Sequence, residues 1–292
     1  MPAVWVSCGF MTEREVIELA PAIEQLGFDG ITLPDHLFTP ETEGPYPYSA
    51  DGKPPFGLDT PWPDPLVLIG ALGVLTTRLR FMTSVYILPL RHPVDVAKLV
   101  ATAARLCDGR LLFGVGVGWR REEFDVLGVP FEGRGARTNE MIGMLRTLWG
   151  EQPAEHAGAL FSFPRAHVEP VPPPIPIVVG GKSDAALRRV AALADGYILP
   201  GQALSGIAGE LDRVRAALAA ADRELSDLDI FVPCLGAPAE EILAALEPAI
   251  GNVVVMPWPH PGKGETSMTE KLQHLERYAS DVLVQLRAGA PA

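Results

Sequence analysis

Eight short apolar segments recur along this 292-residue chain, and segments with helical periodicity separate them. We expect strands at Val4–Cys8, Phe28–Leu33, Leu79–Leu88, Leu111–Val117, Ile175–Val179, Asp195–Leu199, Asp229–Pro233 and Asn252–Met256. Short apolar strands that alternate with helices indicate a parallel sheet. Eight is the number of strands that closes a (β/α)8 barrel, and the chain length suits that fold. We therefore predict an α/β protein whose residues 1–292 form one (β/α)8 TIM barrel domain.

Helix boundary signals support this alternation. Thr12 and Glu15 form a capping box, and Gly27 ends the periodic apolar pattern that follows it. Asp64-Pro65 is typical of an N-cap followed by proline at the first helical position. We expect helices from Thr12 to Gly27, about Pro65 to Thr76, about Pro93 to Leu106, Arg134 to Trp149, Ser183 to Ala194, Ile207 to Ala221, Ala239 to Ala249, and about Met268 to Leu286.

Two connections are longer than a compact barrel needs. Leu37–Pro63 follows the second strand and is rich in proline, glycine and aromatic residues. A loop of this size is usually functional or disordered, and the aromatic residues favour a lid or pocket wall, with plain surface packing as the alternative. Glu151–Pro174, between the fourth and fifth strands, is expected to be an irregular, proline-rich excursion.

A doubly wound open sheet is the alternative fold. A nucleotide-binding version would carry G-x-G-x-x-G after its first strand, which this chain lacks. The glycines that end the fourth strand, Gly114, Gly116 and Gly118, have a different spacing. Glycines there let a flat or bulky group approach the backbone, although a tight strand-to-helix turn would also use them.

Composition excludes several classes of function. The 24 basic and 36 acidic residues give a net charge of −12, which disfavours general binding to nucleic acids or membrane surfaces. Three scattered cysteines without CxxC spacing indicate a reducing compartment. A signal peptide and a bilayer-spanning apolar run are both missing from the sequence, so we expect a cytoplasmic protein.

Unusual residues follow the predicted strands. The sets are Asp35-His36 after the second strand, Ser84-Val85 late in the third, the glycines after the fourth, Gly180-Gly181-Lys182-Ser183 after the fifth, Gly196 to Gly201 around the sixth, and Trp258 to His260 after the eighth. The carboxyl ends of all strands in a barrel point to one face, where active sites lie. We expect these residues to meet there.

Two of these sets carry recognisable chemistry. The Gly180–Ser183 turn offers free backbone N–H groups at a helix start with Lys182 beside them, which suits a phosphate, although a plain turn with a serine N-cap would look the same. His36 next to Asp35 can move a proton or hydrogen-bond a carbonyl, and a surface pair is the alternative.

The six histidines form no cluster at metal-ligand spacing, so no metal is predicted, and no G-x-S-x-G elbow is present. A bound organic cofactor would then supply the reactivity.

Together these residues resemble the luciferase-like monooxygenase superfamily, specifically its deazaflavin-dependent branch. The matching stretches are LPDH (33–36), DTPWPDPL (59–66), TSVYILPLRHPVDVAK (83–98), GRLLFGVGVGWRREEFDVLGVPFEGRGART (109–138) and PPIPIVVGG (173–181). The resemblance implies a barrel that binds coenzyme F420 across the strand exits and moves a hydride between the deazaflavin ring and an organic substrate.

The resemblance also implies roles for individual residues. Asp35 and His36 would lie by the ring, with His36 near the substrate as the catalytic residue. Ser84-Val85 would form a bulge behind the ring through a non-proline cis peptide bond. Cofactor contacts would further come from Gly116 and Gly118, which line the channel, from Gly180 and Gly181, which hold a phosphate, and from cations such as Lys182, Arg91, Arg120 or Arg121.

One position departs from the family pattern. Some members, sugar-phosphate dehydrogenases among them, place a catalytic glutamate directly after the fourth-strand glycines, where this chain has Trp119. A general acid is therefore not transferred to that position, and a more apolar substrate is favoured over a sugar phosphate. Glu122 and Glu123 lie nearby in the sequence and receive no chemical role here.

Two alternatives to an F420-dependent oxidoreductase stay open. One is an FMN-dependent monooxygenase on the same scaffold. The other is a non-enzymatic barrel that binds a flavin or deazaflavin. The resemblance further implies a homodimer, and the expected ligand in the enzymatic cases is a small-molecule substrate.

Overall fold

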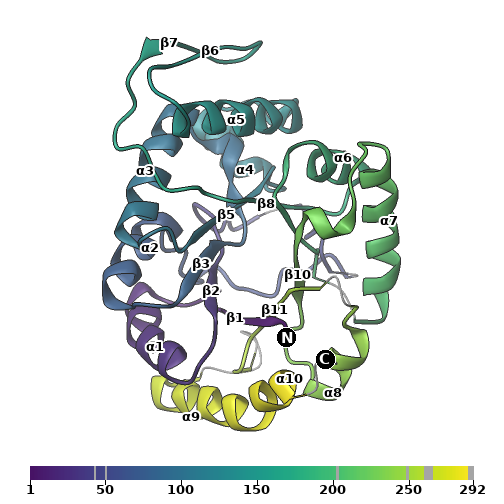
Figure 1. Cartoon of the computed structure of the whole chain (residues 1–292). Helices are drawn as coiled ribbons and strands as arrows, with labels where there is room; N and C mark the ends of the chain where they lie inside the picture. The colour runs from purple at the N-terminus through teal and green to yellow at the C-terminus, as the bar shows by residue number, and fades with distance from the viewer. Residues whose placement is uncertain (43, 50, 202–203, 248–249, 260–265, 289–292) are drawn as a thin grey trace.

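A closed barrel of parallel strands forms the centre of the protein in the computed structural model (Figure 1), which describes all residues except 43, 50, 202–203, 248–249, 260–265 and 289–292. The barrel strands are β1 (Ala3–Ser7), β2 (Gly30–Leu33), β3 (Arg80–Thr83), β5 (Leu111–Gly116), β8 (Ile177–Gly180), β9 (Gly196–Ile198), β10 (Asp229–Pro233) and β11 (Asn252–Val255). They are ordered β3-β2-β1-β11-β10-β9-β8-β5, and pairing of β3 with β5 closes the ring. The predicted (β/α)8 barrel is confirmed.

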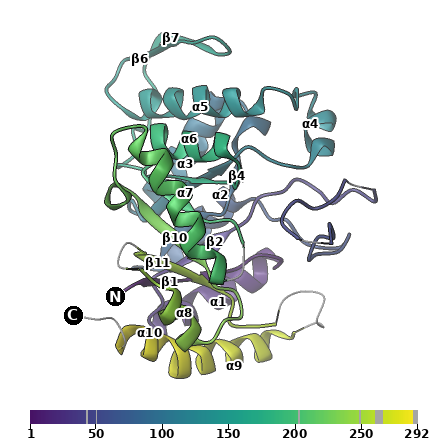
Figure 2. The ribbon, with the colours of Figure 1, turned by 90° about the vertical axis from the view of Figure 1, so that its right-hand side faces the viewer.

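Helices surround the strands, as the two views at right angles show (Figures 1 and 2). They are α1 (Glu13–Gln25), α2 (Pro65–Leu75), α3 (Pro93–Leu106), α4 (Arg121–Leu127), α5 (Arg134–Trp149), α6 (Asp184–Leu193), α7 (Ile207–Ala219), α8 (Ala239–Ala245), α9 (Met268–Tyr278) and α10 (Val284–Ala288). The expected caps are present: Thr12 forms the capping box, Asp64 accepts from two backbone N–H groups, and Ser183 accepts from Ala186. Among the described helices, none is both long and apolar enough to cross a membrane.

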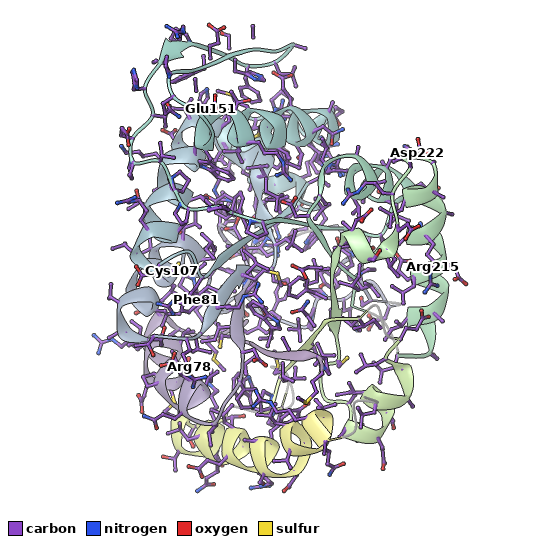
Figure 3. The ribbon with its side chains drawn as sticks, in the orientation of Figure 1. Arg78, Phe81, Cys107, Glu151, Arg215 and Asp222 are labelled. Carbon is purple, nitrogen blue, oxygen red and sulfur yellow. The ribbon has the colours of Figure 1, made fainter. Side chains whose placement is uncertain are left out.

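Apolar side chains fill both the barrel interior and the layer between barrel and helices. The interior layer takes one residue from each of seven strands: Trp5, Met82, Leu112, Val178, Ile198, Phe231 and Val254. At the eighth strand, β2, the paired residue is Gly30, because a Cβ there would come within 2.2 Å of the Trp5 ring. In the outer layer, Phe81 and Cys107 are fully buried, whereas Arg215 and Asp222 lie at the periphery on the α7 side (Figure 3).

The third predicted strand, Leu79–Leu88, was wrong in being continuous. It consists of β3 and the two-residue β4 (Tyr86–Ile87), which pairs with β5 further along the barrel rim. The peptide bond between Ser84 and Val85, at the break, is cis, which confirms the bulge and the bond that the family resemblance implied.

Other differences concern connections. The excursion over Glu151–Pro174 is not wholly irregular, since β6 (Ala154–Ala157) and β7 (Ser162–Ala166) form an antiparallel hairpin outside the barrel (Figure 1). Helix α4 was not predicted, and the last helix is interrupted by a π-helical turn at Ala279–Leu283. Helix α8 ends at Ala245 rather than Ala249, and residue 249 lies outside the described residues.

Candidate functional site

A cavity of about 640 Å³ opens at the carboxyl ends of the barrel strands. Nine of the residues predicted for the site line it: Asp35, His36, Ser84, Val85, Gly116, Gly118, Gly180, Gly181 and Lys182. Trp258 is buried outside this lining, and His260 lies outside the described residues. The expected meeting of distant residues at one barrel face is therefore present, while the roles assigned to them stay predictions.

His36 is hydrogen-bonded to Glu123, and the sequence analysis did not predict this contact. Its Nδ1 lies 3.1 Å and 3.2 Å from the two carboxylate oxygens of Glu123, which is fully buried on α4. The same carboxylate accepts the backbone N–H of Leu37 at 2.7 Å. A carboxylate that accepts from both groups fixes the Nδ1 proton on the imidazole, which leaves Nε2 as the ring nitrogen for a bound molecule. The spacing Arg120-x-x-Glu123 on a short helix was the available signal, but nothing in the sequence indicated which glutamate turns inward.

Asp35 lines the cavity, and its carboxylate has protein partners there. Its carboxylate receives two hydrogen bonds from the Arg91 guanidinium, one of them at 2.8 Å, and a third from the backbone N–H of Ile87 at 2.8 Å. A bidentate pair of this kind fixes geometry. Although Asp35 borders the cavity, its carboxylate fastens the β2 exit to the segment after the bulge, and it thereby positions its neighbour His36.

The glycines around the bulge make room for protein atoms. A Cβ on Gly116 would come within 2.5 Å of Val85 Cγ2, and one on Gly180 within 2.8 Å of Val85 Cγ1. Gly118 has a φ of +76° and would meet Ile87 at 2.7 Å. The absence of side chains at Gly116 and Gly180 lets Val85 pack against two neighbouring strands, and Ser84 and Val85 of the bulge line the cavity.

The turn between β8 and α6 presents backbone and cation together. Gly181 has a φ of +134°, a conformation that favours glycine, and Ser183 caps α6. The Lys182 ammonium donates to the carbonyl of Pro47 and lies 5.3 Å from the centre of the Tyr48 ring. Lys182 therefore connects this turn to the long loop after β2.

The three arginines expected to contact the cofactor are not among the residues that line the cavity. Arg91 pairs with Asp35, Arg120 is fully buried 3.9 Å from Glu123, and Arg121 pairs with Glu132 at the surface. The charged lining instead includes Arg134, which donates to the Gly118 carbonyl at 3.0 Å. Burial, with Arg121 nearby, lowers the pKa of Arg134.

Five aromatic residues line the cavity next to His36, and we call them the aromatic wall: Phe10, Tyr46, Phe56, Trp62 and Trp119. The His36 ring lies 4.9 Å from Trp62 and 5.8 Å from Trp119, both edge-to-face. Three of the five rings come from the loop predicted to be a lid or pocket wall. Burial raises the pKa of Tyr46 to about 12, so its phenol is neutral at physiological pH.

Possible metal ligands are dispersed: in the described parts of the chain, His, Cys, Asp and Glu do not gather in threes around a possible ion.

The closed barrel carries a cis-peptide bulge, a half-buried histidine paired with a buried glutamate, and a glycine-lined cavity at the strand exits. The chain belongs to the luciferase-like monooxygenase family, whose sequence pattern matches residues 6–288.

Curated relatives include both uncharacterized and named proteins. The chain is 36% identical over 279 residues to an uncharacterized protein of Mycobacterium tuberculosis, which covers 92% of this chain and 95% of that protein. It is 30% identical over 226 residues to an F420-dependent glucose-6-phosphate dehydrogenase of Nakamurella multipartita, which covers 75% of this chain and 62% of the relative.

Solved structures share the fold at lower identity. An F420-dependent secondary alcohol dehydrogenase in complex with an F420–acetone adduct superposes with a TM-score of 0.77 at 15% identity, over 98% of this chain and all of that one. The oxygenating constituent of 3,6-diketocamphane monooxygenase of Pseudomonas putida, in complex with FMN, gives a TM-score of 0.71 at 13% identity, over 97% and 98% of the two chains.

Proposed function

We propose that this protein is an F420-dependent oxidoreductase that transfers a hydride between the deazaflavin coenzyme and a small organic substrate. The observation that carries the proposal is one cavity in which the bulge, the glycine turn and His36 face the same space. The likeness to F420-dependent relatives supports it further.

The residues around the cavity fit such a coenzyme. The Ser84–Val85 bulge offers a platform of backbone that a flat ring can approach. Gly180 and Gly181, with Lys182 and the start of α6, would hold the phosphate, because backbone N–H groups at a helix N-terminus and a cation favour an anion. Gly116 and Gly118 would line the channel between these parts.

When bound, the coenzyme would accept or donate the hydride. His36 would handle the proton that accompanies it, taking it from a substrate hydroxyl or giving it to a carbonyl through Nε2. Glu123 would keep Nδ1 protonated and hold the ring in place, and Asp35 would hold the start of this loop through Arg91 and Ile87. We regard Glu123 and Asp35 as positioning residues.

Two other functions remain as alternatives. FMN-dependent oxygenation has support from the fold shared with an FMN-containing monooxygenase. A barrel that binds the cofactor without catalysis has no specific observation in its favour, and the His36–Glu123 pair speaks against it, because burying a carboxylate under a cavity histidine costs stability.

A cofactor titration separates these functions. The purified protein would be titrated with oxidised F420 and, separately, with FMN, while binding is followed by absorbance and fluorescence. We expect saturable F420 binding and substrate-dependent reduction of bound F420 in a screen of alcohols. Tight FMN binding with oxygen consumption, and no F420 binding, would contradict the proposal.

We also propose that the protein is a cytoplasmic homodimer. Its three cysteines are free and buried, which matches a reducing compartment. On α2, Val67 and Val74 are 71% and 67% exposed, and Leu99 and Leu106 of the adjacent α3 are also exposed. Exposed apolar side chains on two adjacent helices are typical of an interface. The mass in solution, measured by light scattering, should be near 63 kDa, roughly twice that of one 31.3 kDa chain, and Val74→Lys should lower it to that of a monomer.

A further inference from the structure

We propose that the His36 end of the cavity selects an uncharged, largely apolar substrate with a single polar group that hydrogen-bonds to His36. This inference rests on the proposed function in so far as the selected molecule is the one that is oxidised or reduced. It concerns recognition, which can be measured without turnover.

The first support is the material of the walls. The aromatic wall surrounds His36 through a chain of ring contacts: Phe56 lies 5.1 Å from Trp62, and Trp119 lies 5.3 Å from Tyr46. Most of these contacts are edge-to-face, which leaves the rings at steep angles to each other around the histidine. Trp62 donates its indole N–H to Thr39 at 2.9 Å. A molecule beside His36 would therefore meet mainly apolar ring surface.

The second support is the charge around His36. The Glu123 carboxylate is engaged by His36 and Leu37 and lies 3.9 Å from Arg120, while Asp35 is engaged by Arg91. These buried opposite charges compensate each other in pairs. A charged substrate group brought into this end would lose its hydration and gain no counter-charge from these pairs, which is costly in a low-dielectric site.

The third support is the position of the fixed cations, which disfavours a positively charged substrate at this end. The Arg120 guanidinium lies 4.9 Å from the centre of the Trp119 ring and 5.6 Å from that of Phe56. A substrate ammonium attracted to the same two rings would therefore approach a fixed positive charge. Anions are favoured elsewhere, because Lys182 lies beside Tyr48. The chain of ring contacts from Tyr48 to His36 passes through Tyr46 and Trp119.

Two hydrogen-bonding groups at this end can bind a single oxygen atom of the substrate. His36 offers Nε2, and the neutral phenol of Tyr46 is a second hydrogen-bonding group in the wall. An alcohol or a ketone can bond to one such group and bury the rest of its surface against the rings. The structure therefore assigns this end to an apolar or aromatic alcohol and its carbonyl product, and not to a sugar phosphate, carboxylate or amine.

Three probes with one ring and different head groups test the inference: benzyl alcohol, benzoate and benzylammonium. Each is titrated into the full-length protein at pH 7 by calorimetry, in the absence of F420 and of turnover. We expect benzyl alcohol to bind at least about tenfold more tightly than either charged probe, which corresponds to 1.4 kcal/mol. Equal or tighter binding of benzoate or benzylammonium would overturn the proposal.

Matched variants locate the binding site. Trp119→Ala and Phe56→Leu should each weaken benzyl alcohol binding several-fold, and Trp119→Phe should keep most of it. Phe161→Ala, which removes an aromatic ring beside the outer β6–β7 hairpin, serves as the control and should bind like the wild type. Unchanged binding by both Trp119→Ala and Phe56→Leu would contradict the assignment to the aromatic wall. Because no coenzyme is present, this result is independent of whether F420 or FMN binds.

Discussion

The two ends of the cavity are built from different parts of the chain. The glycine end, Gly180 to Ser183 with the Val85 bulge, lies at the rim of the barrel. Gly180 and Gly181 must be glycine there, because a Cβ atom at either position would come too close to a neighbouring side chain. The aromatic end consists of side chains from the long loop after β2, together with Phe10 and Trp119. Backbone at the rim is compatible with any side-chain sequence that keeps its glycines, whereas the aromatic end depends on particular side chains. We infer that the first end serves a common cofactor and the second end sets substrate choice.

The largest effect should come from the histidine at the aromatic end. His36→Asn removes the group proposed to move the proton, and kcat should fall by about 10²- to 10⁴-fold. The Kd for F420 should stay within about twofold, since we place the coenzyme's phosphate at the other end. Steady-state kinetics and a coenzyme titration on the same preparation measure both quantities. If coenzyme affinity and kcat both fall strongly, the proposal that the two ends have separate roles is contradicted.

Next in size is the carboxylate that holds the histidine. Glu123→Gln removes the negative charge and leaves one acceptor oxygen for two N–H donors, the Nδ1–H of His36 and the backbone N–H of Leu37, so the preference for the Nδ1–H tautomer weakens. A lost buried hydrogen bond to a charged group, about 1.5–3 kcal/mol, corresponds to a fall in kcat of about 10- to 100-fold. The neighbouring Glu122→Gln is the control and should leave kcat unchanged. Nitrogen NMR of the imidazole gives a second readout, and an unaltered tautomer in Glu123→Gln would refute the positioning role.

At the glycine end, the expected effect is on stability. Gly116→Ala brings a methyl group within 2.5 Å of Val85 Cγ2, and overpacking of this kind costs about 1–3 kcal/mol of unfolding free energy. Val85→Ala in the same chain should restore part of this loss, which urea unfolding of the four proteins of the double-mutant cycle can measure. Gly143→Ala on α5, where a Cβ meets open space, should be neutral or stabilising. Additive losses in the cycle would mean that Gly116 does not make room for Val85.

The smallest effect should come from the cation at the glycine end. Lys182→Met removes one charge-assisted contact with the proposed phosphate, so the Kd for F420 should rise about tenfold at low salt and less at high salt. The kcat at saturating coenzyme should be unchanged, in contrast to His36→Asn. The control is Arg188→Met, which removes an exposed cation on α6, the helix that follows this turn, and it should bind F420 like the wild type. A fall in kcat without a change in Kd would reverse the roles assigned to the two ends.

Much of the fold follows from local pattern. The boundaries of α3 and α5 match the expected ones, because residues at their ends mark them: Pro93 begins α3, and Gly133 and Gly150 flank α5. The hairpin β6–β7 escaped prediction because its strands are mostly exposed and lack the apolar alternation that identifies a half-buried strand. Helix α4 was missed because seven residues give too few turns for a periodic pattern.

The sequence by itself determined the alternation of strands and helices, the placement of Asp35, His36, Ser84 and the glycines after strands, and hence one rim where they meet. Those features depend on residues close together in the chain. Only the tertiary structure decided that Asp35 is occupied by Arg91, that Val85 needs Gly116 and Gly180, and that Glu123 rather than Glu122 lies under His36. Such contacts join residues 31 to 95 positions apart, and their partners are selected by the closure of the barrel and by burial, which no local spacing records.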